Sequence, residues 1–154
     1  MIRRAEERDF DSLIEIAIAS ELFEPEETDL ISQMLRDQTE TDIWLTAEGE
    51  ENPVGVAYLA PEKMTSGTWN LLMIAVHPDH QRCGVGKAIL DYVESWLSEN
   101  NERMLVIETA GVPEFDYVRA FYTREGFEQE ATIRDFYEAS VDKVVFRKVL
   151  KSVN

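Results

Sequence analysis

The stretch Trp69–Lys87, which reads WNLLMIAVHPDHQRCGVGK, decides the fold. Its first part, Trp69–Val76, is apolar almost throughout, as in a strand that is covered on both faces. Pro78 ends this strand, because proline cannot donate a ladder hydrogen bond. A loop with two glycines comes next, and apolar residues at three- and four-residue spacing then mark an amphipathic helix. The stretch therefore predicts a buried strand, a glycine-containing turn and a helix in direct succession.

Further elements are expected on both sides of this stretch. Before it, the patterns predict a strand at 2–5, a helix capped by Asp9 or Asp11, a second helix after Pro25, and strands near 41–47 and 54–60. After it, they predict strands near 104–109, 127–134 and 143–148, and a helix at 117–124 that ends at Gly126. A strand–helix–strand crossover joins parallel neighbours, whereas hairpins are antiparallel. We expect an α/β protein of the α+β type, with a mixed, mainly antiparallel central sheet and helices on both faces.

The size and composition are those of a globular protein. The chain has 154 residues, of which 44% are hydrophobic, so we expect a single domain over 1–154 and exclude intrinsic disorder. Cys83 is the only cysteine, which rules out an internal disulfide. We expect no membrane span, because no segment has the roughly 20 apolar residues that one needs. No cluster of residues suggests a metal site, and the expected location is cytoplasmic.

The charge is strongly acidic: 15 basic and 31 acidic residues give 15 − 31 = −16. A nucleic-acid partner is not expected, because binding phosphates requires clustered lysine and arginine. The negative electrostatic field of such a protein favours cationic partners such as amines, although a need for solubility alone also explains the acidic charge.

The glycine loop, Gln81–Gly86, indicates an anion site. The first N–H groups of a helix have no partner within the helix and carry partial positive charge. Two glycines let a phosphate approach those donors, and Arg82 and Lys87 add local positive charge. A purely structural turn is the alternative. The spacing fits neither a dinucleotide fingerprint nor a Walker loop, so we expect a pyrophosphate site of another kind.

Three segments resemble the GNAT superfamily of N-acetyltransferases. Val76–Leu90 resembles its acetyl-CoA motif, Q/R-x-x-G-x-G/A. The opening IRRAEERD resembles its first strand and turn, and Phe121–Phe127, which reads FYTREGF, resembles its second signature. The resemblance covers nearly the whole chain. It implies the GNAT fold, acetyl-CoA as acetyl donor, and transfer to a primary amine by direct attack in a ternary complex.

The resemblance also implies the residues that bind acetyl-CoA, in a cleft where two parallel central strands splay apart. Backbone groups of Ile74, Ala75 and Val76 would pair with the pantetheine arm, as an added strand does. The pyrophosphate would lie against the loop, whose expected contacts are Gln81, Arg82, Cys83, Gly84, Val85, Gly86 and Lys87. Since the thioester lies a whole pantetheine arm away from this loop, a covalent role for Cys83 is not favoured.

Two residues are the candidates for the chemistry. Tyr122 matches the tyrosine of the family's second signature, which implies that it acts as acid for the CoA sulfur; packing of its ring is the alternative. Glu108, expected at the end of a central strand, is the candidate base, and burial is expected to raise its pKa. A plain hydrogen-bonding carboxylate, with a water chain as base, is the alternative. His77 and His80 lie on the pyrophosphate side and are not expected to take part.

The acceptor is left open by the sequence. Acidic and aromatic residues in two segments, 21–27 and 134–138, suit an ammonium, and the candidates there are Glu21, Glu24, Asp135 and Tyr137. Phe115 stands where many family members have an asparagine. A small amine, an amino acid and a basic peptide all remain open as acceptors, and a homodimer is common in the family. Other functions kept open are a non-catalytic acyl-CoA-binding regulatory module and a nucleotide-binding domain.

Overall fold

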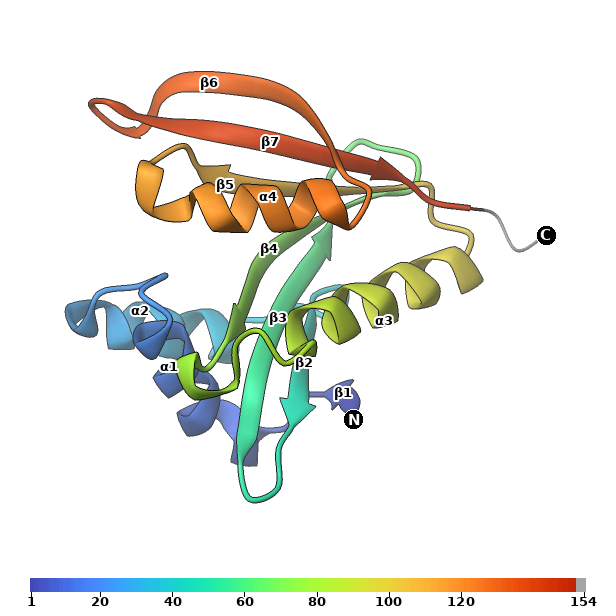
Figure 1. The fold of residues 1–154 in the computed structure, drawn as a ribbon. Helices are drawn as coiled ribbons and strands as arrows, with labels where there is room; N and C mark the ends of the chain where they lie inside the picture. Colours follow the sequence, from blue (N-terminus) through green and yellow to red (C-terminus); the bar gives the residue numbers. More distant parts are fainter. Residues whose placement is uncertain (152–154) are drawn as a thin grey trace. The chain divides into compact units, whose positions relative to one another are not determined.

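A computed structural model describes residues 1–151 of the chain. The strands are β1 (Ile2–Arg4), β2 (Ile43–Glu48), β3 (Pro53–Pro61), β4 (Thr68–Val76), β5 (Met104–Ala110), β6 (Glu128–Glu138) and β7 (Val141–Val149). The α-helices are α1 (Phe10–Ala19), α2 (Thr28–Arg36), α3 (Val85–Glu99) and α4 (Asp116–Arg124) (Figure 1). Short 3-10 turns precede α1, α2 and α4, and one follows β4: η1 (Glu7–Asp9), η2 (Pro25–Glu27), η4 (Pro113–Phe115) and η3 (Pro78–His80). The predicted order of strands and helices is confirmed.

The strands form one sheet in the order β1-β2-β3-β4-β5-β7-β6. β1 and β3 each pair with β2 in antiparallel fashion, and β7 pairs in the same way with β5 and β6. β4 and β5 run parallel, and their pairing covers Thr68–Leu71 and Met104–Ile107. The predicted mixed, mainly antiparallel sheet is therefore confirmed.

The chain falls into two compact units, which we describe one at a time. The first comprises Met1–Pro61 and Leu72–Ser95, and the second comprises Glu62–Leu71 and the residues from Trp96 on. That residues 1–154 act as a single domain stays a prediction.

In the first unit, helices cover both faces of the sheet. The apolar side chains of α1 and α2, including Leu13, Ile16 and Leu35, pack with Trp44, Val56 and Met73 on one face. Gly55 lies next to Val56 in β3 and therefore points to the opposite face, because neighbouring residues of a strand point to opposite sides. A Cβ at Gly55 would lie only 3.0 Å from Ile89 and 3.2 Å from Val85, so α3 lies close against that face.

The start of α1 differs from the expectation. Neither Asp9 nor Asp11 caps the helix through its side chain; the Asp9 carboxylate instead accepts a hydrogen bond from the N–H of Glu6 at 2.8 Å and pairs with Arg3 at 2.7 Å. The reason is the 3-10 turn η1, which comes before the helix and takes Asp9 as its last residue. The Arg3 guanidinium keeps the pKa of the buried Asp9 carboxyl below its usual value.

In the second unit, β5 and β7 are the inner strands and the β6–β7 hairpin forms the edge (Figure 1). α4 buries Tyr122 against the rings of Phe127 and Phe146, whose centroids lie 6.0 and 5.6 Å from that of Tyr122. Gly126 follows α4 with a φ of 91°, as expected for a helix terminator. β6 is exposed along its whole length.

Candidate active site

The loop between β4 and α3 has the backbone shape of an anion nest. Arg82 and Gly84 both have left-handed backbone, with φ values of 62° and 84°, on either side of Cys83. Alternation of left- and right-handed residues turns successive N–H groups toward one point, and the N-terminus of α3 adds its own donors. A Cβ at Gly84 would meet no atom within 4 Å, so this side of the loop is open. The loop therefore fits a pyrophosphate held by backbone N–H groups.

The side chains of the loop are largely engaged with the protein itself. The amide of Gln81 donates to the carbonyl oxygen of Val76 at 3.0 Å, and the thiol of Cys83 donates to the carbonyl oxygen of Gln81. Lys87 pairs with Asp91 one turn further along α3, at 3.0 Å. Three residues of β4 were expected to pair with the pantetheine arm. Of these, Ala75 is part of the core beneath α1 and α2, whereas Ile74 and Val76 are half-buried. The Gln81 contact occupies one carbonyl that the pantetheine arm was expected to use.

Tyr122 lies on the inner side of α4 and is 4% exposed. Phe121, Phe127 and Phe146 surround its ring. Burial raises the pKa of the Tyr122 phenol well above its usual value, and Tyr117 adds to this. The phenol is therefore protonated at physiological pH, so it can donate a hydrogen bond or a proton.

Glu108 stands directly after the last residue of β5 that pairs with β4. Its two carboxylate oxygens have different partners: Oε2 pairs with Nζ of Lys143 at 2.7 Å, and Oε1 accepts a hydrogen bond from Nδ2 of Asn70 at 3.1 Å. The side chain is 27% exposed. A lysine and an amide therefore hold this partly buried carboxylate, and its role as base stays a prediction.

Tyr122 and Glu108 belong to opposite faces of the second unit's sheet. In the continuous β5–β7 register, Ile107 lies opposite Phe146 and Glu108 lies opposite Val145. Since successive side chains of a strand alternate, Phe146 and Glu108 point to opposite faces. Tyr122 packs on Phe146, so α4 covers the face away from Glu108.

Three residues around Glu108 were missed by the sequence reasoning. The amide of Asn70 donates to Glu62 as well, at 2.8 Å, and its own oxygen is buried with no hydrogen-bond partner. An asparagine inside an apolar strand was a signal that could have been followed. Lys143 is separated from Glu108 by 35 positions, and nothing in its surrounding sequence points to the pairing.

The acceptor candidates lie in different parts of the fold. In the first unit, Glu21 is exposed and has left-handed backbone, with a φ of 63°. The backbone N–H of the exposed Glu24 donates to the Glu27 carboxylate at 3.0 Å, at the start of η2. In the second unit, Asp135 and Tyr137 lie within β6, in a segment that was expected to be a loop. The carboxylate of Asp135 accepts the N–H of Ser140 at 2.8 Å and so shapes the hairpin end. Tyr137 is 48% exposed, and burial together with the charge of Glu108 raises the pKa of its phenol.

The segment between β5 and α4 is stiffened by Arg119. Its guanidinium donates to the carbonyl oxygens of Ala110 at 2.7 Å and Val112 at 3.0 Å, and it also pairs with Asp116. Phe115, at the position where many family members have asparagine, ends the 3-10 turn η4 in this segment. Arg119 therefore ties the segment between β5 and α4 to the side of α4.

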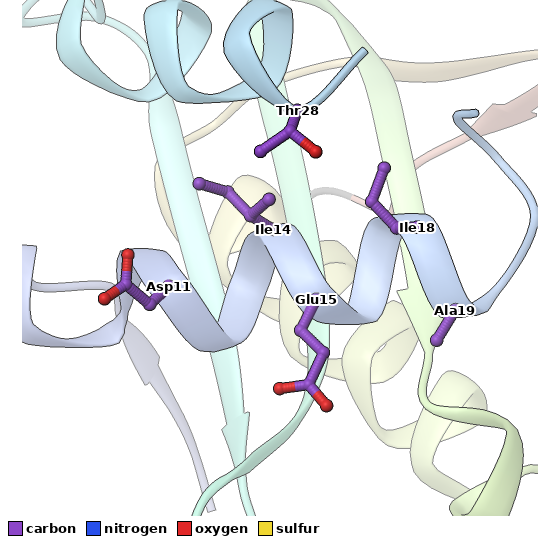
Figure 2. Close-up of a pocket in the computed structure, with 6 residues that line it drawn as sticks. All are labelled: Asp11, Ile14, Glu15, Ile18, Ala19 and Thr28. Atoms are coloured by element: carbon purple, nitrogen blue, oxygen red, sulfur yellow. The ribbon is translucent and has the colours of Figure 1, made fainter. Parts of the chain in front are cut away.

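A shallow hollow of about 440 Å³ lies on α1, and none of the residues predicted for the site lines it. It is lined by Asp11, Ile14, Glu15, Ile18, Ala19 and Thr28. Figure 2 shows Ile14 and Ile18 pointing toward Thr28 at the start of α2, while Glu15 points away. Because the hollow is open and none of the predicted site residues lines it, we assign it no role in the chemistry.

Within residues 1–151, no helix has the length and apolar character to span a bilayer. The same residues contain no group of three histidine, cysteine or acidic side chains arranged to hold a metal ion.

Comparison with known proteins identifies the family. The sequence profile of the acetyltransferase (GNAT) domain matches residues 40–129, more than half of the chain. The chain therefore belongs to the GNAT family of acetyltransferases, whose members use acetyl-CoA. No curated protein sequence gives a significant match.

Solved structures agree with this assignment. A protein assigned to the GNAT family from Desulfovibrio desulfuricans has 29% sequence identity and a TM-score of 0.90, with 98% of this chain and 99% of that chain covered. The ribosomal-protein-S18-alanine N-acetyltransferase from Escherichia coli has 19% identity and a TM-score of 0.83, covering 100% and 96%. An aminoglycoside 6'-N-acetyltransferase complexed with coenzyme A has 12% identity and a TM-score of 0.80, covering 100% and 99%. The last two show a shared fold.

Proposed function

We propose that this protein transfers the acetyl group of acetyl-CoA to a primary amine, by direct attack of the amine on the thioester. The observation that carries the proposal is the pairing of the Glu108 carboxylate with a primary ammonium, that of Lys143, at 2.7 Å. It supports the view that this carboxylate can bind the ammonium group of an acceptor. Acetyl-CoA supplies the acetyl group as a reactive thioester.

The loop after β4 has the binding role in this proposal. The N–H groups of residues 82–87 hold the pyrophosphate, and the left-handed conformations of Arg82 and Gly84 support this role. Gln81 stabilises the end of β4 through the carbonyl of Val76. Because the protein's net charge is −16, a local cradle of backbone donors is needed to attract an anion at all.

Glu108 acts as the general base. A free amine with a pKa of about 10 is almost wholly protonated at neutral pH, so it must lose a proton before it attacks. Asn70 holds one carboxylate oxygen by a hydrogen bond, which leaves the other directed toward an ammonium. Asn70 is thus a positioning residue.

Tyr122 acts on the leaving sulfur. A thiol has a pKa of about 8.5, well below that of the buried phenol, so complete proton transfer from Tyr122 to a thiolate is uphill. The phenol therefore stabilises the developing thiolate as a hydrogen-bond donor. The incoming nitrogen and the outgoing sulfur are bonded to the same carbon in the tetrahedral intermediate, so the proposal requires the Glu108 carboxylate and the Tyr122 hydroxyl to reach one point from their two faces of the sheet.

The acceptor class we propose is a cationic amine, either small or at the end of a basic peptide. The net charge of −16 favours such a molecule. The Escherichia coli relative is named for an alanine of a ribosomal protein, and another relative for aminoglycosides. Glu21, Glu24, Asp135 and Tyr137 remain the proposed contacts on the acceptor side.

The test compares two carboxylates that share one partner. Glu62 and Glu108 both accept from the amide of Asn70, so Glu62→Gln is a matched control for Glu108→Gln. We expect Glu108→Gln to lower kcat/KM for a reactive amine about a hundredfold, while Glu62→Gln leaves it unchanged. Equal kinetics of Glu108→Gln and the unmodified protein would exclude Glu108 as base.

A non-catalytic acyl-CoA-binding module is the second candidate, and the same samples separate it. Both functions predict that acetyl-CoA raises the melting temperature of the protein, since ligand at a hundred times its Kd adds about 2.7 kcal/mol of stability. Only the enzyme releases CoA thiol when an amine is added. Stabilisation by ATP or NAD equal to that by acetyl-CoA would contradict both and favour a nucleotide-binding domain.

A further inference from the structure

Lys143 occupies a cage of the kind that binds a substrate ammonium. Its Nζ lies 2.7 Å from the Glu108 carboxylate and 4.1 Å from the centroid of the Phe136 ring. A carboxylate beside an aromatic face is the combination that attracts alkylammonium groups most strongly. Both partners belong to the second unit, and the Lys143 side chain is only 12% exposed.

The cage is built rather than accidental. Asn70 is 3% exposed and donates a hydrogen bond to Oε1 of Glu108, whereas Lys143 contacts Oε2. Phe136, which is 49% exposed, makes an edge-to-face contact with Tyr137, at 5.1 Å between ring centroids. The register of β5 with β7 places Lys143 two positions from Val145, the residue opposite Glu108, and therefore on the same face of the sheet.

We propose that Lys143 is an internal acceptor, so that the protein acetylates its own Lys143 side chain. The proposal rests on the function proposed above and adds to it a modification site. Lys143 meets two of the requirements for an acceptor amine: its ammonium is bound, and the proposed base is in contact with it.

In this reaction the acetyl group passes from the sulfur of acetyl-CoA to Nζ of Lys143. One proton of the ammonium passes to Oε2 of Glu108 and on to solvent. The freed lone pair of Nζ forms a bond to the thioester carbonyl carbon, and the carbon–sulfur bond breaks with its electron pair on sulfur. A second proton from the nitrogen goes to the thiolate, which leaves as the thiol of CoA, and Lys143 becomes a neutral acetamide.

Lys63 provides the control for uncatalysed acetylation, because it is exposed. The full-length protein is incubated with acetyl-CoA at several protein concentrations, and acetylated lysines are quantified by peptide mass spectrometry. We expect Lys143 to be acetylated at least tenfold faster than Lys63, with a rate constant independent of protein concentration. Heat-unfolded protein should lose this preference, and Glu108→Gln should lose it while keeping its fold.

Lys143→Arg keeps the positive charge beside Glu108 but cannot be acetylated, so it should remove the signal at that position without unfolding the protein. An added amine that supports thiol release should slow the acetylation of Lys143, because both need the same carboxylate.

The outcomes separate this inference from the proposed function. Thiol release with an added amine, together with an unmodified Lys143, would overturn self-acetylation and leave the enzyme intact. A rate that rises with protein concentration, or that equals the rate at Lys63, would overturn the internal reaction as well. Absence of both thiol release and acetylation of Lys143 would remove the proposed function, and this inference with it.

Discussion

At the scale of single residues, Tyr122 gives the clearest prediction. Tyr122→Phe removes one hydroxyl and keeps the ring that packs against Phe127 and Phe146. We expect unchanged melting temperature and acetyl-CoA affinity, and a fall in kcat of about a hundredfold, as for the loss of one hydrogen-bond donor to a developing anion. Tyr117→Phe, an exposed position on the same helix, is the control in steady-state assays. Unchanged kcat of Tyr122→Phe would assign Tyr122 to packing alone.

Asp9 gives a prediction for the pH dependence of stability. Its pKa is lowered by Arg3, so the native state favours the ionised carboxyl, and the resulting stability is present above the usual pKa and lost as the pH falls. We expect the free energy of unfolding to decrease from about pH 4 downward. Asp9→Asn should lose about 2 kcal/mol at neutral pH and depend less on pH in that window.

Urea unfolding at a series of pH values measures this effect, with Asp11→Asn as the control. Asp11 is exposed on α1, so its replacement should change stability by less than about 0.5 kcal/mol. Parallel pH curves for Asp9→Asn and the unmodified protein would mean that the Arg3 pair does not stabilise the fold.

At the scale of elements, the loop before α3 can be tested by comparing two glycines. Gly84 and Gly126 both have left-handed backbone, with φ values of 84° and 91°. Alanine at either position should cost about 1 kcal/mol of stability. Only Gly84→Ala should also weaken acetyl-CoA binding, by about tenfold, because its Cβ projects into the open side of the loop. Equal affinities of the two variants in calorimetry would contradict the pyrophosphate role.

The elements themselves were largely predictable from the sequence. Apolar runs and turn residues predicted every strand and helix in order, and the structure shifts their ends by a few residues. The largest shift is in β6, which continues to Glu138 because Asp135 adopts left-handed backbone and lets the strand pass through an irregular register. The 3-10 turn before α1 was not predicted, so Asp9 was assigned the wrong partner.

The candidate site was predictable only where its residues share a motif. The loop 81–87 and Tyr122 lie in local patterns whose chemistry does not depend on distant residues. The surroundings of Glu108 depend on Asn70, Lys143 and Phe136, which reach it through strand pairing. Pairing between distant strands follows from the register, and a single sequence does not specify that register side chain by side chain.

At the scale of the whole molecule, the net charge of −16 should act on the acceptor. Charges are screened over about 30 Å at 0.01 M salt and about 8 Å at 0.15 M. For an acceptor with several positive charges, we expect kcat/KM to fall roughly tenfold between these salt concentrations. For an acceptor with a single ammonium the fall should be much smaller. The same salt dependence for both would mean that the acidic surface serves solubility.

The most direct test of acetyl transfer is the release of CoA thiol from acetyl-CoA, followed as primary amines are added one at a time. The panel includes small amines, amino acids and basic peptides, and the acetylated product is identified by its mass. The account predicts thiol release that depends on the amine, with one acetylated amine for each thiol. Stabilisation of the protein by acetyl-CoA without amine-dependent thiol release for any member of the panel would contradict it and favour a binding module.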